Sequence, residues 1–297
     1  MRYRRWITGF WLLVLTVLSG PAGAAPLPVF VSIQPQRYFV QQIGGEHVAV
    51  EVMVAPGASP ATYEPKPRQM AALTEARLYF AIGVPFETAW LDKIAAANPA
   101  MQVIHTDRGI RKRPMAAHRH GALEPHGHDD PDHDHGIPDP HIWLAPPLIE
   151  HQAQTICKAL QAADPAHSAD YAANLRHFAA DLAALDRALR VMFADKAGQQ
   201  FMVFHPSWGY FAEAYDLEQV TVEIEGKNPK PAQLQALIEH ARERGIRVIF
   251  VQPQFSTRSA ELLAREIGGR VVFADPLAAD WAANLKAVAA QVAAALR

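Results

Sequence analysis

The sequence predicts an α/β protein with two lobes, each a mostly parallel sheet flanked by helices, joined by one long rigid helix. Two observations support this: short runs rich in Val and Ile alternate with helical segments, and the alternation occurs twice. A third is an apolar stripe with helical spacing between the two sets. With 297 residues, 50% of them hydrophobic and 20% charged, the chain is neither a disordered nor a multi-span membrane protein.

Residues 1–25 have the features of a secretory signal. Three arginines at positions 2, 4 and 5 precede a mostly apolar run, and small residues at 22–24 suit a signal peptidase. The run is too short to span a bilayer comfortably, which disfavours a retained membrane anchor. No cysteine stands at the cleavage position, so we expect no lipid anchor. The sequence therefore predicts cleavage and a periplasmic location.

Residues 26–163 are expected to form the N-terminal lobe. Its strand-like runs are Val29–Ile33, Val48–Val54, Leu78–Ile82 and Gln102–His105. Helical segments lie between them at Gln36–Ile43, Pro67–Ala76 and Glu87–Ala96. Such an alternation of strand and helix is typical of a parallel sheet with helices on both faces.

Residues 164–196 are expected to form the joining helix. Its apolar residues are spaced alternately by four and three positions: Tyr171, Leu175, Phe178, Leu182, Leu185, Leu189 and Met192. Asp164-Pro165 is a suitable start, with proline in the first turn. The alternative is a coiled-coil dimer helix, but the flanking charges that set coiled-coil pairing are sparse. We therefore predict a rigid spine packed against both lobes.

Residues 197–297 are expected to form the C-terminal lobe. Its strand-like runs are Phe201–Phe204, Thr221–Ile224, Arg247–Val251 and Arg270–Phe273. Its helical segments are Phe211–Ala214, Gln233–Arg244, Ser259–Ile267 and Ala279–Ala295. The two halves thus repeat one architecture without obvious sequence repetition.

A histidine-rich stretch at residues 116–136 lies late in the first lobe. It interleaves aspartates with six histidines: His118, His120, His126, His128, His133 and His135. Proline and glycine break any helix or strand, so we expect a loop whose imidazoles and carboxylates capture divalent metals at weak, exchangeable sites. A purification tag or a plain polar linker would explain this composition less well.

Three other residues are candidate ligands of a tighter, buried site. His141 lies in the segment Asp139-Pro140-His141-Ile142-Trp143-Leu144, where rigid apolar neighbours would fix the imidazole. His205 and Asp275 each follow a strand-like run of the second lobe, and ligands of open α/β sheets bind beyond the carboxyl ends of strands. Each alone could be a core histidine or a helix-capping aspartate. Their joint placement favours a divalent metal site.

The chain resembles the metal-specific solute-binding proteins of ABC importers, the zinc and manganese group called cluster A-I or ZnuA-like. The segments that carry the resemblance are Pro56-Gly57-Ala58-Ser59-Pro60-Ala61-Thr62-Tyr63-Glu64-Pro65, Asp139-Pro140-His141-Ile142-Trp143-Leu144, Phe204-His205 with Gly209-Tyr210-Phe211, Glu225-Gly226-Lys227-Asn228-Pro229, and Asp275-Pro276-Leu277. They occur in the family's order and cover nearly all of the chain after the signal.

The resemblance implies that His141, His205 and Asp275 are metal ligands and that Zn²⁺ is the ion. Members that prefer manganese usually have a carboxylate where His205 stands, whereas imidazole favours zinc. One departure matters, because the family's first histidine ligand is replaced by Ala61, which cannot coordinate. The fourth position could hold water, Glu64, or a loop histidine such as His133 or His135.

Zinc capture and delivery to an inner-membrane ABC permease is therefore the leading hypothesis, for a monomer that is not an enzyme. Alternatives are binding of manganese or another divalent ion, a periplasmic metal buffer built on the histidine-rich loop, and a zinc hydrolase with water on an open position. No HExxH sequence supports the hydrolase. A net charge of −2 argues against nucleic-acid binding, and the single cysteine, Cys157, excludes an internal disulfide or a cysteine-based zinc site.

Overall fold

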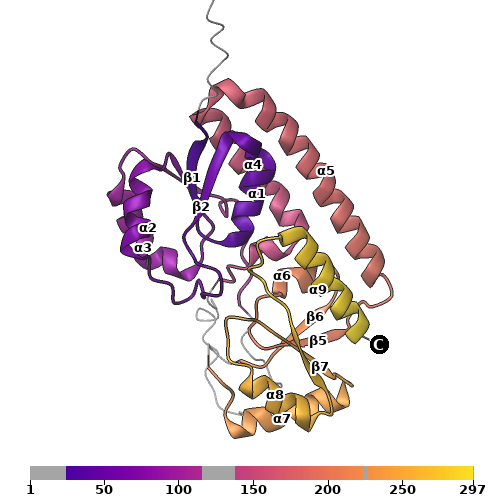
Figure 1. The fold of residues 1–297 in the computed structure, drawn as a ribbon. Helices are drawn as coiled ribbons and strands as arrows, with labels where there is room; N and C mark the ends of the chain where they lie inside the picture. The colour runs from indigo at the N-terminus through magenta and orange to yellow at the C-terminus, as the bar shows by residue number, and fades with distance from the viewer. Residues whose placement is uncertain (1–24, 116–137, 224–226, 297) are drawn as a thin grey trace, which may run out of the picture.

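The computed structural model describes residues 25–115, 138–223 and 227–296, and it contains two four-stranded sheets that are parallel throughout. Each sheet belongs to one lobe, with helices packed around it (Figure 1). The predicted two-lobed α/β class is confirmed. None of the helices in the described part of the chain combines the length and apolar character that crossing a bilayer requires.

The first sheet has the strand order β2-β1-β3-β4. Its strands are β1 (Leu27–Val31), β2 (Val48–Val52), β3 (Leu78–Ala81) and β4 (Gln102–His105). The helices that follow them in this lobe are α1 (Gln34–Gly44), α2 (Pro67–Ala72) and α3 (Pro85–Ala97). Short 3-10 turns at Gly45–His47 and Leu73–Glu75 follow α1 and α2, so the last predicted turn of the second helix is a 3-10 turn.

The second sheet has the equivalent order β6-β5-β7-β8. Its strands are β5 (Gln200–Val203), β6 (Glu218–Thr221), β7 (Val248–Val251) and β8 (Arg270–Phe273), with helices α6 (Gly209–Ala214), α7 (Pro231–Glu243) and α8 (Arg258–Glu266). The prediction of a strand at Thr221–Ile224 was wrong by three residues. Strand β6 starts earlier because its four residues pair with the four residues of β5. The register runs from Gln200 with Glu218 to Val203 with Thr221.

The joining helix is α5 (Ser168–Phe193), preceded by a 3-10 turn at Pro165–His167. The predicted start at Asp164-Pro165 is therefore three to four residues early, because the proline begins a 3-10 turn before the α-helix. Five of the predicted stripe residues are buried, while Leu175 and Met192 are partly buried. Helix α4 (Pro146–Ala163), which the sequence analysis missed, packs antiparallel along α5 (Figure 1).

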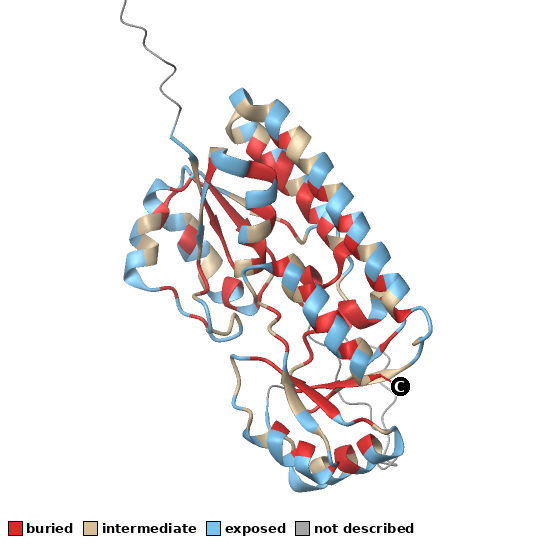
Figure 2. Ribbon diagram, turned by 45° about the vertical axis from the view of Figure 1, so that its right-hand side comes forward, coloured by how far each residue is buried: buried red, intermediate tan, exposed pale blue. Residues whose placement is uncertain are grey.

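The C-terminal helix α9 (Trp281–Ala295) returns to the first lobe and packs on α5. The Trp281 ring lies against Phe39 of α1, with ring centroids 5.1 Å apart. One large core therefore joins the first sheet, α5 and α9, and a smaller core lies under α7 and α8. Figure 2 shows the corresponding burial, with buried strands inside and exposed outer faces on α5, α7 and α8.

Candidate metal site between the lobes

Two of the predicted ligands, His141 and His205, are brought together. Their ring centroids are 5.4 Å apart, and the rings are inclined by 74°. His141 lies just before a 3-10 turn at Ile142–Leu144, and His205 lies two residues beyond the carboxyl end of β5. The pair therefore places the segment just before α4 at the carboxyl edge of the second sheet, where ligands of such sheets bind.

Each imidazole has a carboxylate on its Nδ1 atom. Asp139 Oδ1 is 2.7 Å from Nδ1 of His141, and the two oxygens of Glu223 are 3.1 and 3.2 Å from Nδ1 of His205. These contacts fix the ring orientation and leave Nε2 as the nitrogen that can bind a metal. The sequence analysis did not assign a role to either Asp139 or Glu223.

The environment of His141 keeps its imidazole neutral. The residue is buried, and burial lowers the pKa of His141, while the neighbouring Asp139 carboxylate acts in the opposite direction. Asp139 is itself buried, and it also accepts the backbone N–H of His141 at 2.9 Å. A neutral imidazole is the form that coordinates a metal.

Asp275, the third predicted ligand, lies two residues after β8 at the same edge of the second sheet. Its Oδ1 accepts hydrogen bonds from Gln254 Nε2 and from the backbone N–H of Leu277, both at 2.9 Å. The indole N–H of Trp143 donates to the carbonyl of Pro276 at 2.7 Å, so the Asp275 segment is tied to the His141 segment. Asp275 also lines a small hollow of about 110 Å³ with residues of the first lobe.

Within the described residues, no group of three or more His, Cys, Asp or Glu side chains is arranged to hold a metal. The structure thus joins the two histidines, and the assignment of Asp275 as their partner remains a prediction. The six histidines at 118, 120, 126, 128, 133 and 135 lie outside the described residues.

Ala61 and Glu64 are both exposed, on the segment between β2 and α2. The backbone around Ala61 is anchored, because the N–H of Phe86 donates to the Pro60 carbonyl at 3.1 Å. Tyr63 is buried and donates to Gln69 Oε1 at 2.6 Å. The assignment of Glu64 as an additional ligand also remains a prediction.

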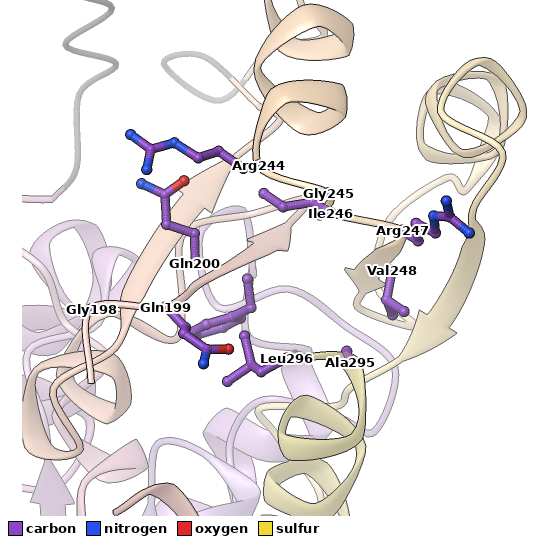
Figure 3. Close-up of a pocket in the computed structure, with 11 residues that line it drawn as sticks. Gly198, Gln199, Gln200, Arg244, Gly245, Ile246, Arg247, Val248, Ala295 and Leu296 are labelled. Atoms are coloured by element: carbon purple, nitrogen blue, oxygen red, sulfur yellow. The ribbon is translucent and has the colours of Figure 1, made fainter. Parts of the chain in front are cut away.

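A second hollow, of about 250 Å³, lies elsewhere in the C-terminal lobe. Gln200 and Val248, which begin β5 and β7, line it together with the end of α9 (Figure 3). This is the amino edge of the sheet, opposite to the edge that carries His205. The hollow is therefore separate from the candidate metal site.

Two parallel-sheet lobes joined by a long helix form the fold shared with solved structures of ZnuA-type solute-binding proteins. The chain belongs to the family described as ZnuA, zinc-uptake complex component A periplasmic, whose model matches residues 29–295. This finding confirms the family resemblance that the sequence motifs predicted.

Individual relatives agree with this assignment. The chain is 30% identical over 282 residues to the high-affinity zinc uptake system protein ZnuA of Paracoccus denitrificans (strain Pd 1222), covering 85% of each chain. A crystal structure of ZnuA superimposes with a TM-score of 0.83 at 43% identity, over 91% of this chain and 99% of that one. A manganese-bound periplasmic metal-binding protein from Candidatus Liberibacter asiaticus has the same fold, with a TM-score of 0.76, 18% identity, and coverage of 91% and 100%. The fold alone therefore does not determine the metal.

Proposed function

We propose that this protein captures Zn²⁺ in the periplasm and delivers it to an inner-membrane ABC permease. The observation that carries the proposal is the His141–His205 pair, with a carboxylate on each Nδ1. Carboxylates hydrogen-bonded in this way orient metal-binding histidines and make them better donors. The name of the Paracoccus relative, a zinc uptake protein, supports the same cargo.

We infer zinc rather than manganese from the donor types. Imidazole nitrogens suit zinc, whereas manganese favours carboxylate, carbonyl and water oxygens. The proposed ligand set is His141, His205 and Asp275, with water or Glu64 at the fourth position. A loop histidine at that position is the alternative, and it would make the 116–136 segment part of the tight site.

The proposed role is binding and release of the ion, without catalysis. Membership of a solute-binding family supports this role. Besides a metal-bound water, a hydrolase would need a base positioned to activate that water, and the sequence has no HExxH motif to supply one. Periplasmic export through a cleaved signal at residues 1–25 follows from the charge and apolar pattern of that segment. We further propose that the protein acts as a monomer.

Calorimetric titration of the mature chain with zinc tests this function. We expect one tight site, further weak binding and no hydrolytic turnover of ester or peptide substrates. His205→Ala should weaken the tight binding step by at least tenfold. Loss of a metal ligand should lower affinity at least as much as loss of a residue that hydrogen-bonds to a ligand. His177→Ala, an exposed histidine on α5, is the matched control. Unchanged tight binding in His205→Ala would show that the ligand assignment is wrong.

A further inference from the structure

The loop between β7 and α8, residues 252–257, lies beside both C-terminal ligand candidates. In the sheet order, β7 stands between β5, which leads to His205, and β8, which leads to Asp275. All three strands are parallel, so their carboxyl ends meet at one edge. The loop leaving β7 is therefore placed to contact both neighbouring segments.

Phe255 of this loop covers one face of the His205 ring. The two ring centroids are 5.0 Å apart and the rings are inclined by only 24°, which is a stacked arrangement. Glu223 contacts the same imidazole at its edge, at Nδ1. The Phe255 contact on the face of the ring and the Glu223 contact on its edge together restrict rotation of the His205 side chain about its Cα–Cβ and Cβ–Cγ bonds.

Gln254 makes the corresponding contact with Asp275. Its Nε2 donates to Asp275 Oδ1 at 2.9 Å, and the Leu277 N–H donates to the same oxygen. With Oδ1 occupied by two donors, Oδ2 is the oxygen left for a metal. Gln254 Oε1 is buried and has no hydrogen-bond partner among the described residues.

The base of the loop is anchored to the His205 segment. Gln252 is 5% exposed, and its Nε2 donates to the hydroxyl of Ser207, which is fully buried. Ser207 lies two residues after His205, and its N–H donates to the His205 carbonyl at 2.8 Å. The loop therefore cannot shift without moving the turn that carries His205.

We propose that Gln254 and Phe255 are two further positioning residues of the zinc site, Gln254 acting through Asp275 and Phe255 through His205. The inference rests on the proposed function, and neither residue binds the ion itself. Ligands held in place before binding lose less conformational freedom when the metal arrives, which raises affinity. The stacked ring also shields one face of His205 from water.

Zinc affinity of the full mature protein tests the proposal. Phe255→Ala and Gln254→Leu should each weaken the tight step by about 10–100-fold, the range measured when partners of metal ligands are removed. Phe255→Leu keeps the apolar bulk without the stacked ring and should also weaken zinc binding. Phe255→Tyr keeps a stacked ring and should bind zinc with near wild-type affinity. Ser256→Ala, an exposed position in the same loop, is the matched control.

Two spectroscopic measurements separate positioning from a general loss of stability. Loading with Co²⁺ reports coordination geometry, and its visible absorption should change in Gln254→Leu but not in Ser256→Ala. In the metal-free protein, the His205 ring-proton resonances should move in Phe255→Leu, because the ring current of Phe255 is lost. This NMR measurement does not depend on zinc binding.

The outcomes distinguish this inference from the function on which it rests. Failure of the wild-type chain to bind zinc tightly would overturn the proposed function, and the NMR shifts would then decide whether Phe255 stacks on His205 in the metal-free protein. If the wild type binds zinc tightly and the zinc affinities of Phe255→Leu and Gln254→Leu are both within threefold of it, the positioning role is overturned and the proposed function stands.

Discussion

The carboxylate of Glu223 reaches Nδ1 of His205 because the two residues stand opposite each other just beyond a pair of parallel strands. The last register pair of β5 and β6 is Val203 with Thr221, so His205 and Glu223 are each two positions further on. The ladder continues past the strands, since the Glu223 N–H donates to the Phe204 carbonyl at 2.9 Å. The orientation of His205 is thus fixed by strand register.

Glu223→Gln should therefore weaken zinc binding without unfolding the lobe. The amide keeps the shape of the side chain but removes the negative charge that makes the imidazole a better donor. We expect about a 10–100-fold loss of affinity in calorimetry. Glu218→Gln, at an exposed glutamate that begins β6, is the control. Equal affinities in the two variants would show that Glu223 does not support the site.

Some features of the fold can be predicted from patterns of residues close together in the sequence, and others cannot. Short Val- and Ile-rich runs and the stripe along α5 are local patterns, and they predicted both sheets and the spine. Helix α4 could have been predicted too, because Ile149, Ala153, Ile156 and Leu160 have helical spacing and are buried. The packing of Trp281 against Phe39 could not, since an apolar helix face does not specify its neighbour.

The residues of the candidate site also fall into those that the sequence predicts and those that only the strand order shows. His141 and His205 stand out as histidines in rigid apolar segments, and the structure places their rings in contact. Glu223 becomes visible only once β5 and β6 are known to be neighbours in a particular register. Gln254 and Phe255 likewise depend on the order β5-β7-β8, which no local pattern encodes.

Zinc affinity should fall as the pH drops below about 6, because protons compete for the ring nitrogens of ordinary histidines near pH 6.5. Burial lowers the pKa of His141, so proton competition at that ring begins at a lower pH than for an exposed histidine. Affinity should therefore be flat while both imidazoles are neutral and decline in acid. Zinc titrations between about pH 7.5 and 5.5 measure this. A constant affinity over that range would indicate a site made of carboxylates.

Deleting residues 116–136 should remove the weak zinc equivalents and leave the tight one. Pro114 and Pro138 form an antiparallel bridge, so the ends of the segment are adjacent and a short Gly-Ser linker can join them. We expect the deletion to keep one zinc with affinity within threefold of wild type. Loss of nearly all binding would instead support the metal-buffer hypothesis.

Introducing the missing histidine tests the fourth position directly. If water fills that position, Ala61→His should tighten zinc binding by tenfold or more, because the shell gains an imidazole and loses no other ligand. The anchored Pro60 carbonyl and the buried Tyr63 hold the backbone on either side of position 61. Thr62→His, also exposed and one residue further on, is the control for adding an imidazole nearby.

The same substitution in the loop-deleted chain separates the remaining possibilities. A gain of affinity in both backgrounds means that water occupied the position. No gain in either background, together with weaker binding in Glu64→Gln, means that Glu64 fills it. If the deletion weakens tight binding by 100-fold or more and Ala61→His restores it there, then a histidine of residues 116–136 is the fourth ligand. That result would overturn our proposal that water or Glu64 completes the shell.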